Sequence, residues 1–417
     1  MTASKKTNRN KRNLAYPIAG LAALLTFIVY SSTLHNGFVY WDDDEYVLEN
    51  LHIRSLDFAF FKWAFFNFYS ANWHPLTWIS HALDYAIWGL NPMGHHLTNN
   101  VFHAINTFLV VLLVVKLIKA VHDSPFTIRD SRLTSHYSRF ALIAAATTGL
   151  LFGLHPIHVE SVAWIAERKD LLCALFYLLS VMAYVKYRTY KSYTTYFLSL
   201  GFFFLALLSK PMAVSLPVVL LILDWYPFQK ITSLKTFRTA FVEKLPFIAL
   251  SSFSSIVTIL AQGSAAVIRS AEFAPLSTRS FSAVKALAAY LYKIILPLNL
   301  LPFYPYALHP SSLFFEYLLP IVLAIGITAG CISLAGRREK FWLCGWTYYV
   351  ATLLPVLGIV QVGDQAMADR YMYLPSLGPF LVIGLTAAWG WERWLCQKIG
   401  VLSVSLFMRG QPCLYLF

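Results

Sequence analysis

Four consecutive acidic residues, Asp42 to Glu45, follow the first long apolar run of this 417-residue sequence. Adjacent carboxylates repel each other, and the apolar flanks Phe38 and Tyr46 favour their burial, so both effects raise carboxylate pKa values. Such a group can serve as a general base or hold a metal or a sugar. The alternative is an acidic turn that is simply solvated.

A second set of polar residues follows a helical period at the start of the apolar run 97–118. His96, Asn99 and His103 recur on one face at 100° per residue, together with Asn100 and Asn106. Polar groups at membrane depth face the bundle interior or a water-filled cavity, which predicts a substrate-lining face. Hydrogen bonding between helices is the equally supported alternative. Metal binding is disfavoured because no third ligand follows at a suitable spacing.

A third set begins with His155, His158 and Glu160 and continues into a charged segment that contains Arg168 and Lys169. These residues lie between apolar runs, on the side where basic residues are normally depleted, so an anionic ligand would explain the cations. The alternative is ion pairing with neighbouring carboxylates. The two histidines again lack a third ligand at helical spacing, which disfavours zinc.

Two further cations lie in short polar turns. Lys210 stands in the three-residue segment Ser209–Pro211, and Arg370 follows Asp369 in a short polar loop. Arginine suits bidentate binding of phosphate, so Arg370 is a candidate phosphate ligand. Lys210 could hold a phosphate or extend to lipid headgroups, and Asp369 could pair locally with Arg370.

The composition shows what must position these residues. Hydrophobic residues make up 58% and charged residues 13% of the chain, against about 45–50% and about 25% in soluble domains. This composition excludes a soluble enzyme, a disordered chain and a collagen-like fibre. The net charge of +13 is explained by basic residues that flank membrane helices on the cytoplasmic side, so no nucleic-acid partner is expected.

The apolar runs predict an all-α polytopic membrane protein with about ten transmembrane helices and eleven as the alternative. Basic loops place the N-terminus in the cytoplasm, and 35–95 and 263–312 become long outer loops with interfacial helices. We interpret 281–300 as interfacial or re-entrant, because a further span would move the basic segment 337–340 outside. Residues 1–13 form a basic cytoplasmic tail, 14–396 the membrane domain and 397–417 a short C-terminal tail. The predicted spans are 14–34, 97–118, 140–154, 171–187, 193–208, 212–228, 245–262, 313–335, 341–361 and 374–395.

Several motifs together resemble a known family. They are the acidic pair after the first span, the polar second helix, His-Pro-x-His-x-Glu-Ser-Val-Ala-Trp from His155, Ser-Lys-Pro from Ser209 and Asp-Arg-Tyr-x-Tyr-Leu-Pro-Ser from Asp369. The pattern from about 14 to 394 resembles the membrane part of the O-mannosyltransferase-like proteins that carry tetratricopeptide repeats, a branch of the GT-C glycosyltransferases. The chain departs from that family in having no 34-residue repeat after its last apolar run.

The resemblance implies transfer of a sugar from a polyprenyl-phosphate carrier to an acceptor hydroxyl of a protein or glycan, outside the cytoplasm. Asp42 or Asp43 would act as base in an inverting reaction, with Asp42 preferred. Lys210, Arg168 and Arg370 would bind the leaving phosphate. The sequence requires no cofactor, although its acids allow a divalent metal, and the expected location is a bacterial inner membrane. The rival functions are a lipid-linked sugar flippase or transporter and a non-catalytic membrane scaffold. The residues expected to line the substrate site are His96, Asn99, His103, His155, His158, Glu160 and Asp369.

Overall fold

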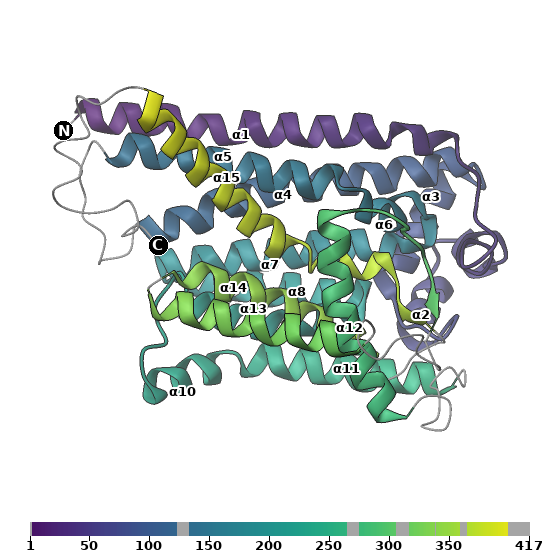
Figure 1. Ribbon diagram of the computed structural model, residues 1–417. Coiled ribbons are helices and arrows are strands. Elements are labelled where there is room, and N and C mark those ends of the chain that lie inside the picture. Colours follow the sequence, from purple (N-terminus) through teal and green to yellow (C-terminus); the bar gives the residue numbers. More distant parts are fainter. Residues whose placement is uncertain are drawn as a thin grey trace.

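The structure is a computed structural model that describes residues 2–122, 133–264, 275–305, 317–337, 339–358 and 365–398. Its described part is a bundle of long helices lying side by side, which confirms an all-α membrane fold (Figure 1). The longer helices are α1 (Thr2–Tyr30), α4 (Pro92–His122), α5 (Leu133–Leu154), α7 (Arg168–Tyr190), α8 (Tyr193–Ser209), α11 (Leu245–Ser264), α12 (Leu276–Ile295), α13 (Leu319–Gly336), α14 (Lys340–Leu353) and α15 (Leu377–Lys398). The shorter ones are α2 (Phe58–Phe66), α3 (Pro75–Trp88), α6 (Val159–Ala163), α9 (Leu216–Trp225) and α10 (Leu234–Glu243).

Each of the ten predicted apolar runs overlaps a helix of this bundle, although 212–228 divides into a 3-10 turn and the short α9, and 313–316 and 359–361 lie outside the described residues. By length and composition, five helical segments of the described residues can cross a membrane: Leu14–His35, Pro92–His122, Ile165–Tyr190, Leu245–Ser264 and Leu319–Gly336. A sixth is added if Arg139–Leu154 and Pro156–Ala163, which meet at a 49° bend, form one span. The count of ten therefore stays a prediction, because several of the remaining helices are too short to cross alone.

Segments predicted to lie outside gather at one end of the bundle. Helices α2, α3 and α6 lie at the end opposite the N-terminus and α10 (Figure 1). The two-residue strand β1 (Tyr304–Pro305) pairs antiparallel with β2 (Gln365–Met367), also toward the α2–α3 end in Figure 1. Helix α12 runs across the long helices instead of along them (Figure 1). That direction agrees with our interpretation of 281–300 as a segment that does not span.

Local chemistry explains how the first loop region becomes ordered. Helix α3 starts at Pro75, whose missing N–H costs nothing at the first helical position. It ends at Gly89, whose φ of +60° is a conformation that favours glycine. Asp57 caps α2 by accepting the backbone N–H of Phe60 at 2.8 Å. The long loop is thus built largely from short helices with defined ends.

Helices α5 and α15 approach each other closely because Gly384 has no side chain. A Cβ atom at Gly384 would lie 2.6 Å from the carbonyl oxygen of Ala144 and 2.3 Å from the Thr148 hydroxyl. Real Cβ atoms essentially never approach other atoms this closely, so this contact requires glycine. The close approach fixes the position of α15, and hence of the loop with Asp369 and Arg370 that leads into it.

Candidate functional site

Asp43 joins the first loop to the segment that precedes α7. Its carboxylate accepts the backbone N–H of Val39 at 2.9 Å and that of Ala166 at 2.8 Å, and its side chain is fully buried. Burial raises the pKa of Asp43 from 3.8 to about 6, although both backbone N–H groups oppose the shift. With both oxygens engaged, Asp43 is suited to holding the loop in place.

Asp42, in contrast, keeps its carboxylate accessible. Its side chain is 33% exposed and lies 3.4 Å from the ammonium group of Lys169. Lys169 is nearly buried, pairs with Glu167 at 3.0 Å, and lies 4.7 Å above the ring of Tyr46. Asp42 is therefore the one of the two predicted catalytic acids that a substrate hydroxyl can reach in this structure.

Lys210 is not the lone cation that its short turn predicted. Its ammonium group contacts the Asp170 carboxylate at 2.6 Å and the Glu167 carboxylate at 3.3 Å. Burial lowers the pKa of Lys210, but the two carboxylates outweigh that effect and the pKa is raised overall. Lys210, at the end of α8, thus stays charged and pairs with two carboxylates at the start of α7.

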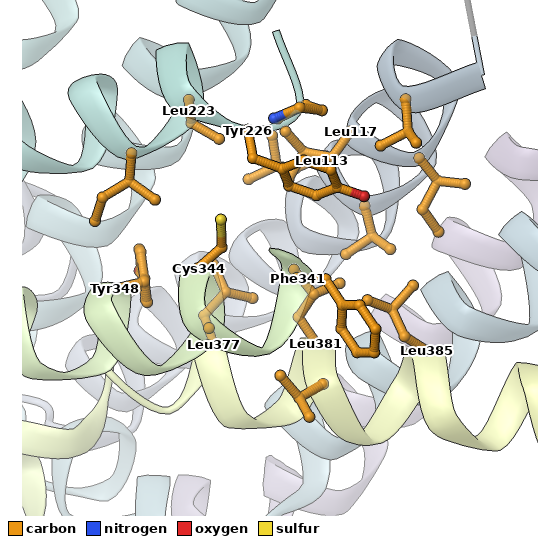
Figure 2. Close-up of a pocket in the computed structure, with 18 of the residues that line it drawn as sticks. Leu113, Leu117, Leu223, Tyr226, Phe341, Cys344, Tyr348, Leu377, Leu381 and Leu385 are labelled. Atoms are coloured by element: carbon orange, nitrogen blue, oxygen red, sulfur yellow. The ribbon is translucent and has the colours of Figure 1, made fainter. Parts of the chain in front are cut away.

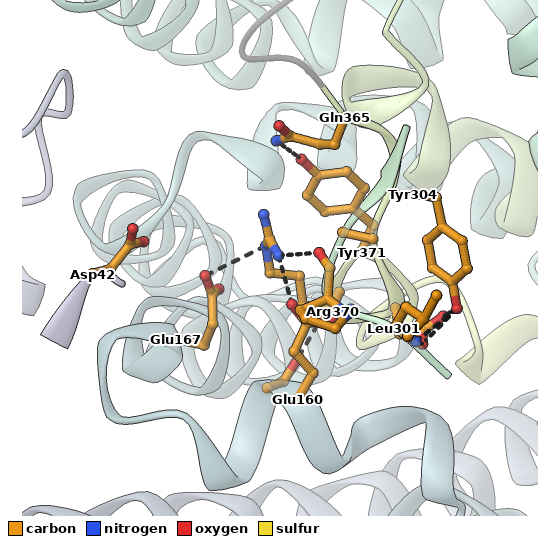
Figure 3. A network of polar contacts seen from close by, with 12 residues as sticks. Asp42, Glu160, Glu167, Leu301, Tyr304, Gln365, Arg370 and Tyr371 are labelled. Carbon is orange, nitrogen blue, oxygen red and sulfur yellow. Dashed lines mark hydrogen bonds and ion pairs between the residues drawn. The ribbon is translucent and has the colours of Figure 1, made fainter. Parts of the chain in front are cut away.

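Arg370 connects the last loop to the same group of charges. Its guanidinium pairs with Glu160 and lies 3.4 Å from Glu167, and its backbone N–H donates to Glu160 at 2.7 Å. Figure 3 shows Glu160 and Glu167 on two sides of this guanidinium, with Asp42 beyond Glu167. Burial lowers the pKa of Arg370, but Glu167 and Glu160 outweigh it and keep the pKa raised. One nitrogen, Nη1, also donates to the Pro302 carbonyl at 2.9 Å, while Nη2 lies outside all of these contacts.

We call the seven charged residues of this group the outer charge cluster, after the side of the membrane on which the sequence predicts these segments. Glu167 lies at its centre, since Lys169, Lys210 and Arg370 all contact its carboxylate. The sequence left Lys169 between an anionic ligand and ion pairing with Glu167 and Asp170, and the structure pairs it with Glu167. Local order does not reveal that Lys210 and Arg370 also contact Glu167. The full set is Asp42, Glu160, Glu167, Lys169, Asp170, Lys210 and Arg370.

Arg168 lies outside the outer charge cluster. Its guanidinium pairs with Asp84 and donates to the Asn99 side chain at 2.8 Å and to the His95 carbonyl at 2.7 Å. The side chain is fully buried. The structure therefore gives Arg168 a role in joining α3, α4 and α7, and it does not place this residue beside the other predicted phosphate ligands.

The polar face of α4 bridges helices. Asn99 donates to the carbonyls of Val162 and Trp164, both at 3.2 Å, and His96 contacts the Gly37 carbonyl at 3.4 Å. The ring of His103 contacts the Tyr373 hydroxyl at 2.7 Å and the Gly153 carbonyl at 3.1 Å. All three α4 side chains are fully buried. The structure thus favours interhelical hydrogen bonding over a substrate-lining role.

Three of the four other predicted lining residues also make hydrogen bonds that join segments of the chain. His158 contacts the Phe152 carbonyl at 2.7 Å and the Ser376 hydroxyl at 2.9 Å, and His155 contacts the Ile294 carbonyl at 2.9 Å. Asp369 accepts the Leu301 N–H at 2.6 Å and the Tyr304 hydroxyl at 3.0 Å, and burial raises its pKa. These contacts fix the segments around Arg370. Of the seven predicted lining residues, Glu160 is the one that joins the outer charge cluster.

Metal binding was left open by the sequence. Within the described residues, no group of three or more His, Cys, Asp or Glu side chains is arranged to hold a metal ion. Glu160 and Glu167 already contact Arg370, and Asp170 already contacts Lys210. A divalent metal therefore remains a proposal for experiment.

Comparison with known proteins identifies relatives of the chain. No protein-family model matches it. It is 31% identical to protein O-mannosyl-transferase Tmtc1 of Drosophila melanogaster over 208 residues, which are 48% of this chain and 22% of that protein. It is 30% identical to protein O-mannosyl-transferase TMTC2 of Homo sapiens over 198 residues, or 46% of this chain and 21% of the relative. The Xenopus laevis protein O-mannosyl-transferase tmtc2 is 29% identical over 260 residues, or 58% and 28%.

The fold and the outer charge cluster define a helical membrane protein with a charged site at one end of its bundle. Its homologues are protein O-mannosyl-transferases, which confirms the resemblance indicated by the motifs. The matched region covers less than a third of the length of each of these three relatives.

Proposed function

We propose that this chain is a membrane glycosyltransferase that transfers a sugar from a polyprenyl-phosphate carrier to a protein hydroxyl on the outer face of the membrane. The observation that carries the proposal is the partly exposed Asp42 carboxylate beside the Lys169 ammonium group, at the edge of the outer charge cluster. The names of the relatives support a mannosyl donor and a protein acceptor. The N-terminus would then lie in the cytoplasm, as the basic loops predict.

Asp42 would act as general base. As the new C–O bond forms at the anomeric carbon, the acceptor hydroxyl passes its proton to the Asp42 carboxylate, and the bond from that carbon to the phosphate oxygen breaks. Attack opposite the departing phosphate inverts the anomeric centre. Asp43 would keep the loop, and hence Asp42, in position through Val39 and Ala166.

Arg370 and Lys169 would stabilise the leaving phosphate. Nη2 of Arg370 lies outside the contacts with Glu160, Glu167 and Pro302, so it can donate to a phosphate oxygen. Cations aimed at developing negative charge favour the transition state over the ground state. Lys210, which the sequence also predicted to bind the donor, would act through Glu167 by holding it in place.

The test is transfer of radiolabel from polyprenyl-phosphate mannose to a protein acceptor by purified protein in liposomes. The wild type should move label to protein, and Asp42→Asn should lose about 10²–10⁴-fold in rate while still binding the donor. The matched control is Asp44→Asn, which changes a partly exposed neighbour of the same chemistry. Parallel reactions with EDTA test the divalent metal. Label that crosses the bilayer while still attached to lipid would instead support a transporter, and label that neither moves nor transfers would support a scaffold.

A further inference from the structure

A largely apolar cavity lies within the bundle, away from the outer charge cluster. Its volume is about 190 Å³, and α4, α7, α9, α14 and α15 line it. Figure 2 shows Leu377, Leu381 and Leu385 of α15 on one side, with Leu113 and Leu223 across the cavity. An apolar cavity of about 150 Å³ can stay dry and bind benzene. This cavity therefore has room for a segment of hydrocarbon.

The cavity extends to the end of the bundle that carries the N-terminus and α10. Its lining includes His122 at the end of α4, Pro227 just beyond α9 and Phe341 at the start of α14. These helix ends lie opposite α2 and α3 (Figure 1). Along α15 the lining runs from Leu377 to Glu392, which at 1.5 Å per residue is roughly 22 Å. The whole hydrocarbon core is roughly 30 Å thick, so the cavity is shorter than the bilayer and suits a chain that enters from one leaflet.

Two cations flank this end of the cavity on aromatic faces. The Arg393 guanidinium lies 3.8 Å from the ring centroid of Trp389, and the Lys340 ammonium group lies 5.4 Å from that of Trp225. Trp389 lines the cavity itself, and Lys340 immediately precedes the lining residue Phe341. A stacked guanidinium still presents N–H donors at its edge, which suits phosphate binding. One acidic residue, Glu392, also lines this end.

We propose that the cavity binds one acyl chain of an anionic phospholipid from the leaflet at the Lys340 end, with the lipid phosphate at Lys340 and Arg393. Charge complementarity selects an anionic headgroup, and the length of the cavity selects a chain of one leaflet. A phospholipid fits better than the sugar donor, because the cavity extends to the end of the bundle opposite Asp42. The site would fix the packing of α14 and α15 and is independent of the proposed transferase reaction.

The test is native mass spectrometry of the full chain in mild detergent with equimolar palmitoyl-oleoyl phosphatidylglycerol and phosphatidylcholine. The wild type should retain one phosphatidylglycerol in preference. In the double variant Lys340→Ala/Arg393→Ala the preference for phosphatidylglycerol should fall about thirtyfold, because two cations that attract an anionic lipid are removed. Its control is Lys235→Ala/Arg238→Ala, which removes two exposed cations of α10 at the same end.

Filling the cavity provides a second test. Leu381→Trp should remove the retained lipid, whereas Ile256→Trp, at a 58% exposed position of α11, should not. Thermal unfolding reports whether each variant is folded, and the charge variant tests the site even if Leu381→Trp does not fold. Equal retention of both lipids by the wild type, or unchanged preference in the charge variant, would overturn the proposal. Displacement of phosphatidylglycerol by polyprenyl phosphate would assign the cavity to the donor instead.

Discussion

Replacing each of two adjacent acids by asparagine should separate catalysis from loop attachment. Asp42 is 33% exposed and makes one distant ion pair, with Lys169 at 3.4 Å. Asp42 is the partly exposed partner of this long pair, and Lys169 keeps its closer pair with Glu167 at 3.0 Å, so Asp42→Asn should change the free energy of unfolding by only about 0–1 kcal/mol. It should nevertheless slow sugar transfer by about 10²–10⁴-fold, because an amide cannot take the acceptor proton.

Asp43→Asn should have the opposite profile. Both Asp43 oxygens accept backbone N–H groups in a fully buried setting, and the NH₂ group of asparagine cannot accept either one. One buried N–H is left unsatisfied, which costs about 1–3 kcal/mol. Transfer per folded molecule should fall far less than in Asp42→Asn. Thermal unfolding and radiolabel transfer on the same preparations measure both quantities.

The difference in stability between the wild type and Asp43→Asn should also depend on pH. The folded-state pKa of about 6 exceeds the ordinary 3.8, so the folded protein binds the proton more tightly than the unfolded chain. The resulting stabilisation is complete below about pH 4 and is lost as pH rises through about 6. Between pH 5 and pH 7 the free energy of unfolding of the wild type should fall by about 1 kcal/mol, because Asp43 loses its proton. Asp43→Asn has no such group, so the difference in free energy of unfolding between the two proteins should be larger at pH 5 than at pH 7.

Several results would refute this reasoning. Full transfer activity in Asp42→Asn would remove Asp42 from the role of base. Abolished transfer in a normally stable Asp43→Asn would move that role to Asp43 and show that its backbone contacts are dispensable. A stability difference that grows from pH 5 to pH 7 would contradict the raised pKa of Asp43.

Two further predictions concern packing and charge burial. Lys210→Ala should cost about 3–5 kcal/mol, since it leaves Asp170 and Glu167 buried without that cation, and adding Asp170→Asn should recover part of the loss in thermal unfolding. Gly384→Ala should lower the free energy of unfolding by about 1–3 kcal/mol through overpacking. Gly390→Ala, in the same helix with open space around it, should be neutral or stabilising, and equal unfolding temperatures for the two glycine variants would contradict the close α5–α15 contact.

The sequence determined the class of the fold and the positions of most helices. Apolar runs, prolines and glycines act over a few residues, so the helices at 97–118 and 245–262 could be placed without knowledge of their neighbours. The motifs around His155, Lys210 and Arg370 also indicated the relatives later found by comparison. The number of helices that cross the membrane was not determined, because length and composition leave the shorter helices undecided.

Tertiary structure decided which polar residues share a site. Arg370 meets Glu160 across 210 positions of the chain, and Lys210 meets Asp170 across 40. No local pattern reveals such pairs, so Lys210 looked unpaired and Arg168 looked available for phosphate. Tertiary structure also distinguished the two acids. Asp42 and Asp43 are chemically identical neighbours in sequence, and only burial makes them different. Only the packing of Ala166 and Val39 against one of them leaves the other open to solvent.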